Sequence, residues 1–373
     1  MDRRILILGA GYAQIDAIRY CQQRGIRVCG CSYTTNDPGI PMLDHFRQVD
    51  IKDAAGIAKL AQEQQVDAVY SVGSDLAIPT IMTVSERLGL PHFISPEAAQ
   101  KCHCKHLMRE ALGKDFPGNA YFIVCETLEE TLAYDHFPGM MKPVDSQGQR
   151  GCFRVDSPAD IEARFAASLD YSITGKVILE AYVEGPEISV NAYMQGGELR
   201  LAVISDRFSF DEYPGGIIRA HRVPSLAASG ESAKEVLDLV TRSAQKLGIT
   251  DGPLYDQIKL DKDGHPVILE IAPRLDGCHM WDLIRHYCGA DLLDACFTHL
   301  LEDRPVLTEP FPCPDAGYEL VFNCAPTGSR FDRSANDTDG AEAVVWYYET
   351  GDTVGRVNGY MEKGGYMIRQ IKE

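Results

Sequence analysis

Long hydrophobic runs are absent from this chain of 373 residues, and so is an excess of basic residues. The longest apolar runs, such as residues 5–8, are far too short to span a bilayer, so we expect no membrane insertion. The segment after Met1 also lacks the apolar stretch of a signal peptide. With 36 Lys and Arg against 54 Asp and Glu, the net charge of −18 argues against a nucleic-acid-binding protein, which normally carries a basic face. An acidic chain can still bind an anionic nucleotide through a few local cations.

Paired cysteine motifs are also lacking, although the chain has 12 cysteines. Cys29 and Cys31 share one face of an expected strand, and Cys102 and Cys104 have no matching second pair, so no zinc site is predicted. A chain of this length does not need disulfides to stabilise its core. We therefore expect reduced thiols inside the protein, which indicates a cytoplasmic location.

The first 95 residues alternate apolar strands with segments of helical periodicity, and this alternation predicts a parallel sheet with helices on both faces. The first turn, Gly9-Ala10-Gly11, invites a dinucleotide-binding interpretation. However, Gln14 stands at the third glycine position, and the expected strand 28–32 is followed by no acid that could bind a ribose 2′-hydroxyl. The sequence therefore predicts a Rossmann-like domain that does not bind NAD.

Two apolar runs flank the turn formers at 261–264, which predicts a β-hairpin. If Leu260 pairs with His265, Gln257 lies opposite Ile268. A β-bulge would shift this register by one residue.

Glu270 ends the second strand of this hairpin, and Arg274 follows four positions later. In the simple register, Gln257, Glu270 and Ala272 share one face, with diagonal neighbours roughly 7–8 Å apart. Oxygen ligands of this kind suit Mg²⁺. With a bulge, Asp256 would face the metal in place of Gln257, and an exposed hairpin without a metal is the alternative.

Two other segments carry groups that suit a nucleotide. Residues 140–153 form a loop between expected strands, and Gly148 allows its backbone N–H groups to fold over phosphates. It is not a Walker loop, because no Gly-Lys-Ser/Thr opens a helix there. Residues 177–190 predict a strand that ends in a Gly-Pro turn, after which Glu187 offers an acceptor for two hydroxyls.

Taken in order, these segments resemble the ATP-grasp superfamily, in particular its carbamoyl-phosphate-synthetase-like and amino-acid-ligase branch. Glu270 to Arg274 is similar to the family pattern Glu-x-Asn-x-Arg, although Ala272 replaces the usual Asn. Lys142 and its following proline resemble the ATP-binding lysine, and residues 180–187 resemble the hinge strand. The resemblance covers most of the chain.

The resemblance implies roles for ten residues. Glu180 and Val183 frame the adenine through their backbone, and Glu187 accepts from the ribose. The implied nucleotide contacts are Lys105, Lys142, Gly148, Glu180, Val183 and Glu187; the implied ligands of Mg²⁺ or Mn²⁺ are Gln257 and Glu270; and the implied catalytic residues are Arg274 at the transferred phosphoryl group and Arg219 at the substrate carboxylate.

The resemblance also implies an α/β ATP-grasp fold: a Rossmann-like domain (1–95), a lid subdomain with a linking helix (96–185), an α+β subdomain with the metal hairpin (186–306) and a small β-rich part (307–373). The implied activity is an ATP-dependent carboxylate–amine ligase that acts on amino-acid-like substrates through an acylphosphate, in a family whose members often form homodimers. The alternatives are a carbamoyl-phosphate-type kinase step and a non-catalytic ATP-binding regulatory module.

Overall fold

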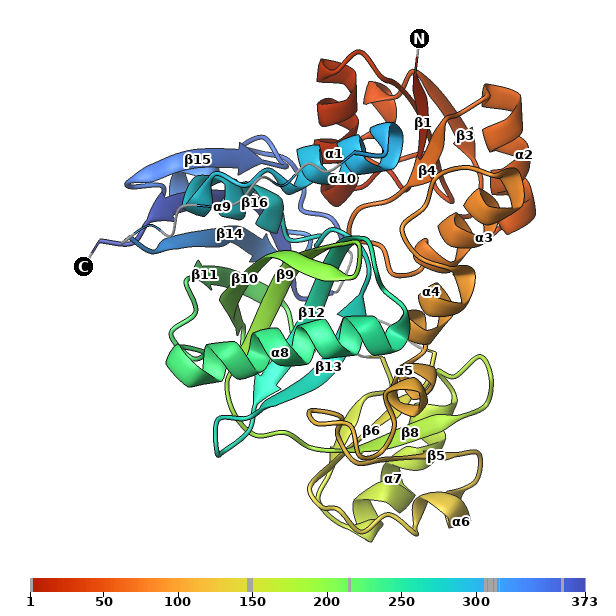
Figure 1. Cartoon of the computed structure of the whole chain (residues 1–373). Helices are drawn as coiled ribbons and strands as arrows, with labels where there is room; N and C mark the ends of the chain where they lie inside the picture. The colour runs from red at the N-terminus through yellow and green to blue at the C-terminus, as the bar shows by residue number, and fades with distance from the viewer. Residues whose placement is uncertain are drawn as a thin grey trace.

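The computed structural model describes residues 3–145, 150–213, 216–304, 307, 311, 314, 316–356 and 359–372. The strands of these residues form sheets of four, eight and four strands. In Figure 1 the N-terminal sheet lies at the top, the other four-stranded sheet lies at the bottom, and the eight-stranded sheet extends between them to the left. The predicted mixed α/β architecture is therefore confirmed.

The N-terminal sheet is parallel throughout, as the alternation of strands and helices predicts, with strand order β3-β2-β1-β4. The strand β3 was missed, because its half-buried residues show no clear apolar alternation. The elements are β1 (Arg4–Leu8), α1 (Tyr12–Gln23), β2 (Arg27–Ser32), η1 (Ile40–Met42), β3 (His45–Gln48), α2 (Ala54–Gln64), β4 (Ala68–Tyr70) and α3 (Ile78–Leu88).

Gln14 closes the turn after β1 with its own side chain. Its Oε1 accepts from the Gly11 N–H at 2.9 Å, and its Nε2 donates to the Val72 carbonyl. In dinucleotide-binding domains, backbone N–H groups of this turn bind phosphate. Here the Gly11 N–H donates to the Gln14 side chain instead. This is the physical reason to expect no dinucleotide at this turn.

Two helices, not one, follow the N-terminal sheet. The sequence predicts a single helix from Glu97 to Leu112, but the structure has α4 (Pro96–His103) and α5 (Lys105–Leu112). Cys104 separates them with an extended backbone, at φ −100° and ψ 115°. No Gly or Pro marks this break. The helical periodicity of the apolar residues continues across Cys104, so it predicts one continuous helix. Lys105 consequently begins a helix instead of lying inside one.

The lower sheet in Figure 1 is an antiparallel sheet with its own small core, which includes Met141, Val155 and Leu179. Its strand order is β5-β8-β6-β7. The sequence of residues 119 to about 185 predicts a strand, helix, strand, loop, strand, helix and strand. The structure confirms this order with β5 (Phe122–Cys125), α6 (Leu128–Thr131), β6 (Gly139–Pro143), β7 (Phe153–Val155), α7 (Pro158–Leu169) and β8 (Val177–Ala181).

The large sheet has strand order β13-β12-β9-β10-β11-β14-β16-β15. Because β14, β15 and β16 continue it, the predicted boundary at 306 divides one sheet; the four-part division of the chain otherwise stays a prediction. The remaining elements are β9 (Glu187–Gln195), β10 (Glu198–Ser209), β11 (Ile218–Val223), α8 (Gly230–Leu247), β12 (Gly252–Leu260), β13 (Pro266–Ala272), α9 (Met280–Cys288), α10 (Leu292–Glu302), β14 (Tyr318–Pro326), η2 (Arg333–Ala335), β15 (Ala341–Trp346) and β16 (Met361–Gln370).

All eleven cysteines that the structure describes are free thiols, nine of them buried and two half-buried. This confirms the prediction of thiols inside the protein for that part of the chain. Burial raises the pKa of several of them, for example that of Cys31 to about 12, so the Cys31 thiol is protonated near neutral pH.

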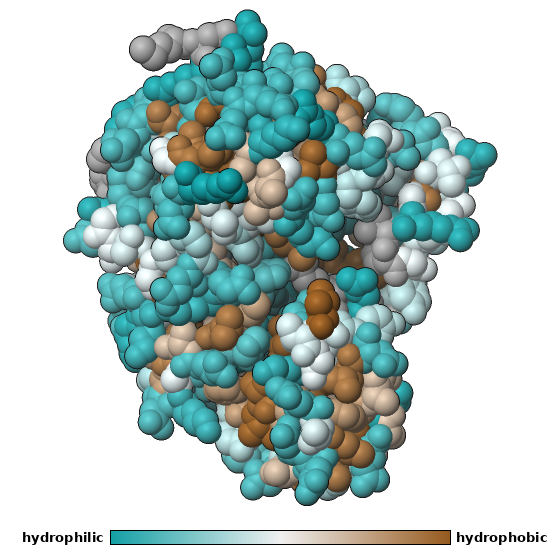
Figure 2. Space-filling model, turned by 90° about the vertical axis from the view of Figure 1, so that its right-hand side faces the viewer, coloured by the Kyte–Doolittle hydropathy of each residue, from teal (hydrophilic) through white to brown (hydrophobic). Residues whose placement is uncertain are grey.

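The molecular surface is mainly hydrophilic on the face in Figure 2, with apolar side chains gathered over its lower half, where the lid lies. Leu128, Leu132 and Ile173 of the lid are exposed. Within the described residues, helices long and apolar enough to cross a bilayer are absent.

Asp256 is a buried carboxyl group on β12, only 1% exposed, and neither of its oxygens has a hydrogen-bond partner among the described residues. Burial raises its pKa well above the usual value. Between the ordinary pKa and this raised pKa, the folded state binds one proton more than the unfolded state, so the free energy of unfolding falls as pH rises.

We expect Asp256→Asn to be more stable than the wild type near pH 8 and to lose that advantage near pH 4. The amide is isosteric and neutral, so it removes a slope of up to about 1.4 kcal/mol per pH unit. Urea unfolding at several pH values measures this difference. The exposed Asp170→Asn is the control, and a parallel pH dependence in Asp256→Asn and the wild type would contradict the prediction.

Candidate active site

A cavity of about 480 Å³ lies where the lid, the large sheet and the N-terminal part meet, and its size is that of a small-molecule site. Its walls draw on segments far apart in the sequence, from Asp75 to Pro273. Seven of the ten predicted site residues line it: Lys105, Lys142, Glu180, Val183, Glu187, Gln257 and Glu270.

The lid wall of the cavity is built around Glu180, which is 3% exposed on the central strand β8. Arg109 Nε donates to Glu180 Oε1 at 2.7 Å, and the Lys142 ammonium pairs with the other carboxylate oxygen. Burial alone would raise the pKa of Glu180, but Lys142 and Arg109 lower it to about 2. This carboxylate therefore stays ionised and fixes both cations.

Arg109 also connects the lid to the large sheet. Its Nη2 donates to the Ile268 carbonyl at 2.7 Å, and its Nη1 donates to Asn119 at 3.0 Å. The side chain is fully buried on α5, between Met108 and Leu112 on the apolar side of that helix. A cation among apolar helix positions is the only sequence signal for this residue, and it was not predicted.

The segment after β8 runs along the cavity, with Ala181, Tyr182 and Val183 in its lining. The Ala181 and Tyr182 N–H groups donate to carbonyls of neighbouring segments, each at 2.9 Å. The Val183 carbonyl accepts from Lys259 Nζ at 3.2 Å. These contacts fix the segment against its neighbours at the cavity wall.

The predicted register of the metal hairpin is wrong from the turn onward, because Leu260 pairs with Pro266 and not with His265, so that Ile258 lies opposite Ile268. A β-bulge then adds a second shift: Leu269 is the extra residue of β13, and Gln257 lies directly opposite Glu270. Directly opposite residues share a face, with Cβ atoms roughly 4.5–5.5 Å apart. The bulge therefore brings the two predicted ligands closer together than the simple register would.

The alternative prediction was that a bulge would turn Asp256, in place of Gln257, toward the metal. The structure does not place Asp256 at the cavity. It lies opposite Ile271 on the other face of β12, where it is buried. Ala272, which replaces the usual Asn, lines the cavity and offers no ligand atom. The donor set at the hairpin is a carboxylate and an amide oxygen, which fits a hard cation such as Mg²⁺.

The electrostatics around Glu270 favour binding a cation. Burial raises the pKa of this carboxyl, and the nearby Asp75 raises it further, while Arg274, Lys105 and Lys142 oppose the shift. Two neighbouring carboxylates in a partly closed cavity repel each other, and a cation between them relieves that cost.

Arg274 lies just outside the cavity lining, 5% exposed, and is held by Asp75. Its Nε and Nη2 donate to the two oxygens of Asp75, both at 2.8 Å, in the bidentate geometry that only a guanidinium provides. Burial alone would raise the pKa of Asp75, but Arg274 holds it below the usual value. Asp75 was missed, although its place just after a parallel strand is where ligands of such sheets bind.

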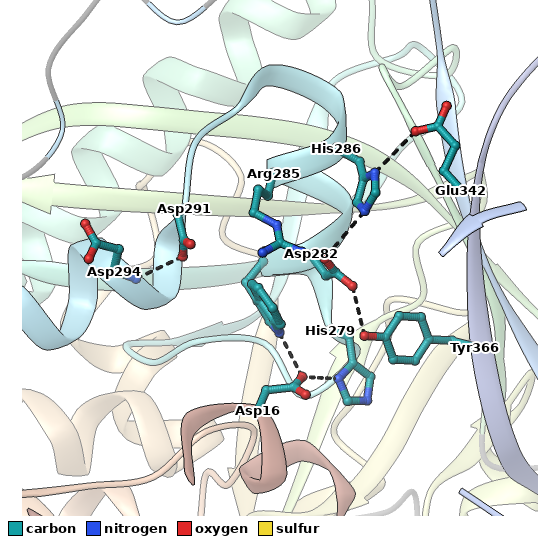
Figure 3. Close-up of polar contacts among 10 residues, drawn as sticks. Asp16, His279, Asp282, Arg285, His286, Asp291, Asp294, Glu342 and Tyr366 are labelled. Atoms are coloured by element: carbon teal, nitrogen blue, oxygen red, sulfur yellow. Dashed lines mark hydrogen bonds and ion pairs between the residues drawn. The ribbon is translucent and has the colours of Figure 1, made fainter. Parts of the chain in front are cut away.

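The loop between β13 and α9 is held by the N-terminal part of the chain (Figure 3). Asp16 on α1 accepts from His279 Nδ1 at 2.5 Å and from Trp281 Nε1 at 2.8 Å. His279 has a left-handed backbone, with φ of 57°, and its ring stacks on Tyr366 at 4.4 Å between centroids. Strain of this kind persists only where surrounding contacts fix the residue, so the loop that carries Arg274 is firmly placed.

The floor of the cavity is a line of charged side chains on the large sheet. Glu187 pairs with Arg207 and accepts from the Gln257 amide. Arg207 and Lys259 line the cavity and were missed by the sequence analysis, although each lies on a strand whose alternation places it beside Glu187.

Besides Arg274, one described residue of the predicted set does not line the cavity. Arg219 is exposed on β11 and does not line it, so its assignment to the substrate carboxylate stays a prediction without geometric support. Gly148 lies outside the described residues.

Comparison with known proteins agrees with this architecture. Residues 135–282 match the family model of the ATP-grasp domain. The mouse carnosine synthase 1 is 27% identical over 272 residues, covering 65% of this chain and 32% of that protein. The formate-dependent phosphoribosylglycinamide formyltransferase of Cupriavidus metallidurans is 24% identical over 196 residues, covering 48% of this chain and 47% of that protein. The chain thus spans between a third and a half of these relatives.

Solved structures match nearly the whole chain. The L-amino acid ligase from Bacillus licheniformis has a TM-score of 0.80 at 16% identity, covering 99% of this chain and 93% of that one. The phosphoribosylglycinamide synthetase from Anaerococcus prevotii has a TM-score of 0.78 at 17% identity, covering 99% and 94%. The protein therefore has the ATP-grasp fold.

Proposed function

We propose that this protein is an ATP-dependent carboxylate–amine ligase that forms an amide or peptide bond between amino-acid-like substrates. The observation that carries the proposal is the pairing of Gln257 with Glu270 across the hairpin, in a cavity that Lys105, Lys142 and Glu187 also line. The match to the ATP-grasp domain and the names of the relatives, among them a carnosine synthase and an L-amino acid ligase, support it.

The nucleotide would lie between the lid and the large sheet. The backbone from Glu180 to Val183 would pair with the adenine edge, and Glu187 would accept from the ribose hydroxyls. Lys105 and Lys142 would bind the phosphates by charge-assisted hydrogen bonds. In the structure Lys142 pairs with Glu180, so it would keep that carboxylate as its second partner.

Glu270 and Gln257 would hold Mg²⁺, with Mn²⁺ as an equivalent ion. When bound, such an ion would neutralise part of the charge that develops on the phosphates during transfer. With Ala272 in the family's Asn position, we propose that coordination depends on fewer protein atoms than the family pattern provides.

The reaction would proceed in two displacements. A carboxylate oxygen of the acid attacks the γ-phosphorus, the bond to the β–γ bridging oxygen breaks, and ADP leaves. The amine nitrogen then attacks the acyl carbon, inorganic phosphate leaves with the bonding electrons, and the amine loses a proton. The chain's own contribution is positioning and charge stabilisation, and Arg274, fixed by Asp75, would stabilise the transferring phosphoryl group.

For the acid substrate, Arg207 is better placed than Arg219. It lines the cavity beside the metal pair, whereas Arg219 is exposed outside it. We therefore assign the substrate carboxylate to the Arg207 end of the cavity.

A homodimer stays a prediction, and light scattering of the purified protein would test it.

We expect Lys142→Ala and Lys105→Ala each to raise the KM for ATP by about tenfold or more, since a hydrogen bond to a charged group contributes roughly 1.5–3 kcal/mol. Calorimetric titration with ATP measures the same loss as a weaker Kd. Lys101→Ala is the control, because Lys101 pairs with Glu97 on the surface of α4. Unchanged ATP binding in both variants would show that these lysines are not phosphate ligands.

The function itself is tested by measuring ADP and phosphate release with pairs of amino acids. Ligation requires release of both products only when an acid and an amine are present. The absence of the usual Asn at Ala272 favours a second candidate, a regulatory module, which should bind ATP without releasing ADP. Release with bicarbonate and ammonia, and not with amino acids, would instead support the carbamoyl-phosphate-type reaction.

A further inference from the structure

A second group of potential ligands lies beside the nucleotide cavity. His221 on β11 and Asp276 and Cys278 on the loop after β13 each have a ligand atom within 4.8 Å of the others. The three residues are 0%, 8% and 7% exposed. Arg207 is the link to the cavity, because it lines the cavity and lies directly opposite His221 in the sheet.

Two buried polar atoms of this group have no partner among the described residues: His221 Nε2 and Asp276 Oδ2. The second polar atom of each side chain does have a partner. Asp276 Oδ1 accepts from the Cys278 N–H at 3.1 Å. His221 Nδ1 lies 3.4 Å from the Ser189 hydroxyl and 3.3 Å from the Ser205 hydroxyl. A metal-binding histidine typically has its second nitrogen oriented by such a partner. A buried polar atom without a partner destabilises the folded state, and a ligand that binds both atoms would remove that cost.

We propose that His221, Asp276 and Cys278 form a site for a borderline transition metal of the Zn²⁺ class, distinct from the Mg²⁺ site at Glu270. One nitrogen, one carboxylate oxygen and one thiolate sulfur make a three-ligand zinc set that leaves a fourth position open. Binding would release the Cys278 thiol proton to solvent. The site would join the loop that carries Arg274 to the floor of the large sheet.

Two positively charged side chains near the group determine which charge the fourth ligand of the metal should carry. Lys363 Nζ donates to Cys278 Sγ at 3.5 Å, and Arg207 is already paired with Glu187. The thiolate and the Asp276 carboxylate cancel the charge of a divalent ion, so Lys363 adds one positive charge and favours an anion, such as hydroxide or a carboxylate, at the open position. Burial, together with Arg207 and Lys363, holds the pKa of His221 well below its usual range, so its imidazole is neutral and available as a ligand.

The test is a calorimetric titration of the chelator-treated full chain with Zn²⁺, in excess Mg²⁺ so that the hard-ligand site at Glu270 is filled. We expect one equivalent to bind, and we expect Asp276→Asn and Cys278→Ser each to weaken the Kd by about tenfold or more. Cys324→Ser is the matched control, since Cys324 is a half-buried cysteine near Lys363 that lies outside the group. Replacement by Co²⁺ adds a spectroscopic readout, because a thiolate ligand gives a near-ultraviolet charge-transfer band.

No binding by the wild type, or equal binding and an unchanged band in Cys278→Ser, would overturn the proposal. Thermal melting checks that the variants are folded, and the isosteric Asp276→Asn decides the matter if Cys278→Ser is unstable. Both readouts are independent of ATP turnover. A failure of the ligase proposal therefore leaves this inference standing, and its own failure leaves the ligase proposal untouched.

Discussion

Glu270→Gln should lower ATP turnover by about a hundredfold or more while the protein stays folded. The change is isosteric, and it replaces the only carboxylate of the Gln257–Glu270 pair with a neutral amide. A metal ion that stabilises a transferring phosphoryl group contributes several kcal/mol to the transition state, and each 1.36 kcal/mol corresponds to about tenfold in rate. Steady-state ADP release at saturating Mg²⁺ and ATP measures the loss.

The stability of Glu270→Gln separates a lost ligand from a damaged fold. Since burial and Asp75 both raise the pKa of Glu270, removing its charge relieves a cost, and the melting temperature should not fall. Glu184→Gln, an exposed carboxylate between β8 and β9, is the matched control and should turn over ATP like the wild type. Near-normal turnover in Glu270→Gln would remove the metal assignment.

The sequence predicted the parts of the site that lie within one local element. Gln257 and Glu270 belong to one hairpin, and residues 180–187 belong to one strand and its turn, so period-two alternation was enough to orient them. Even there a bulge was considered only as an alternative register, and its place at Leu269 was not predicted, because no Gly or Pro marks it. The predicted face was nevertheless correct, since the extra residue in β13 brings Glu270 opposite Gln257.

Residues contributed from a distance were beyond the sequence analysis. Arg109 reaches Glu180 across 71 positions, and Asp75 reaches Arg274 across 199 positions. Neither pairing follows from periodicity, because each depends on how separately folded parts pack together. Arg219 is the converse case: it lies in a local cluster of basic residues, but it is exposed on β11 and does not line the cavity, so its assignment stays a prediction.

The same reasoning explains why the sequence does not indicate the proposed second metal site. Cys278 and Asp276 are neighbours in the sequence, but His221 is more than 50 positions away on another strand. Zinc spacing rules search for pairs of ligands at short intervals, and a set assembled from a loop and a strand has no such interval.

Arg274→Lys should lower kcat by about tenfold to a hundredfold and change the KM for ATP little. Both Arg274–Asp75 hydrogen bonds, each 2.8 Å long, need the planar guanidinium, and a lysine can replace only one of them. Hydrogen bonds to charged groups contribute roughly 1.5–3 kcal/mol, which corresponds to the expected range in rate. Because Arg274 lies outside the cavity lining, ATP binding in the ground state should not depend on it.

Asp75→Asn tests whether Asp75 acts through Arg274. If the pair is one unit, each single variant should lose about as much kcat as the double variant, since residues in one network are not additive. Arg285→Lys is the control, because Arg285 pairs with Asp282 on α9, away from the cavity. A rise in the KM for ATP with kcat intact would make Arg274 a ground-state binder, and additive losses would show that Asp75 has a separate role in the cavity it lines.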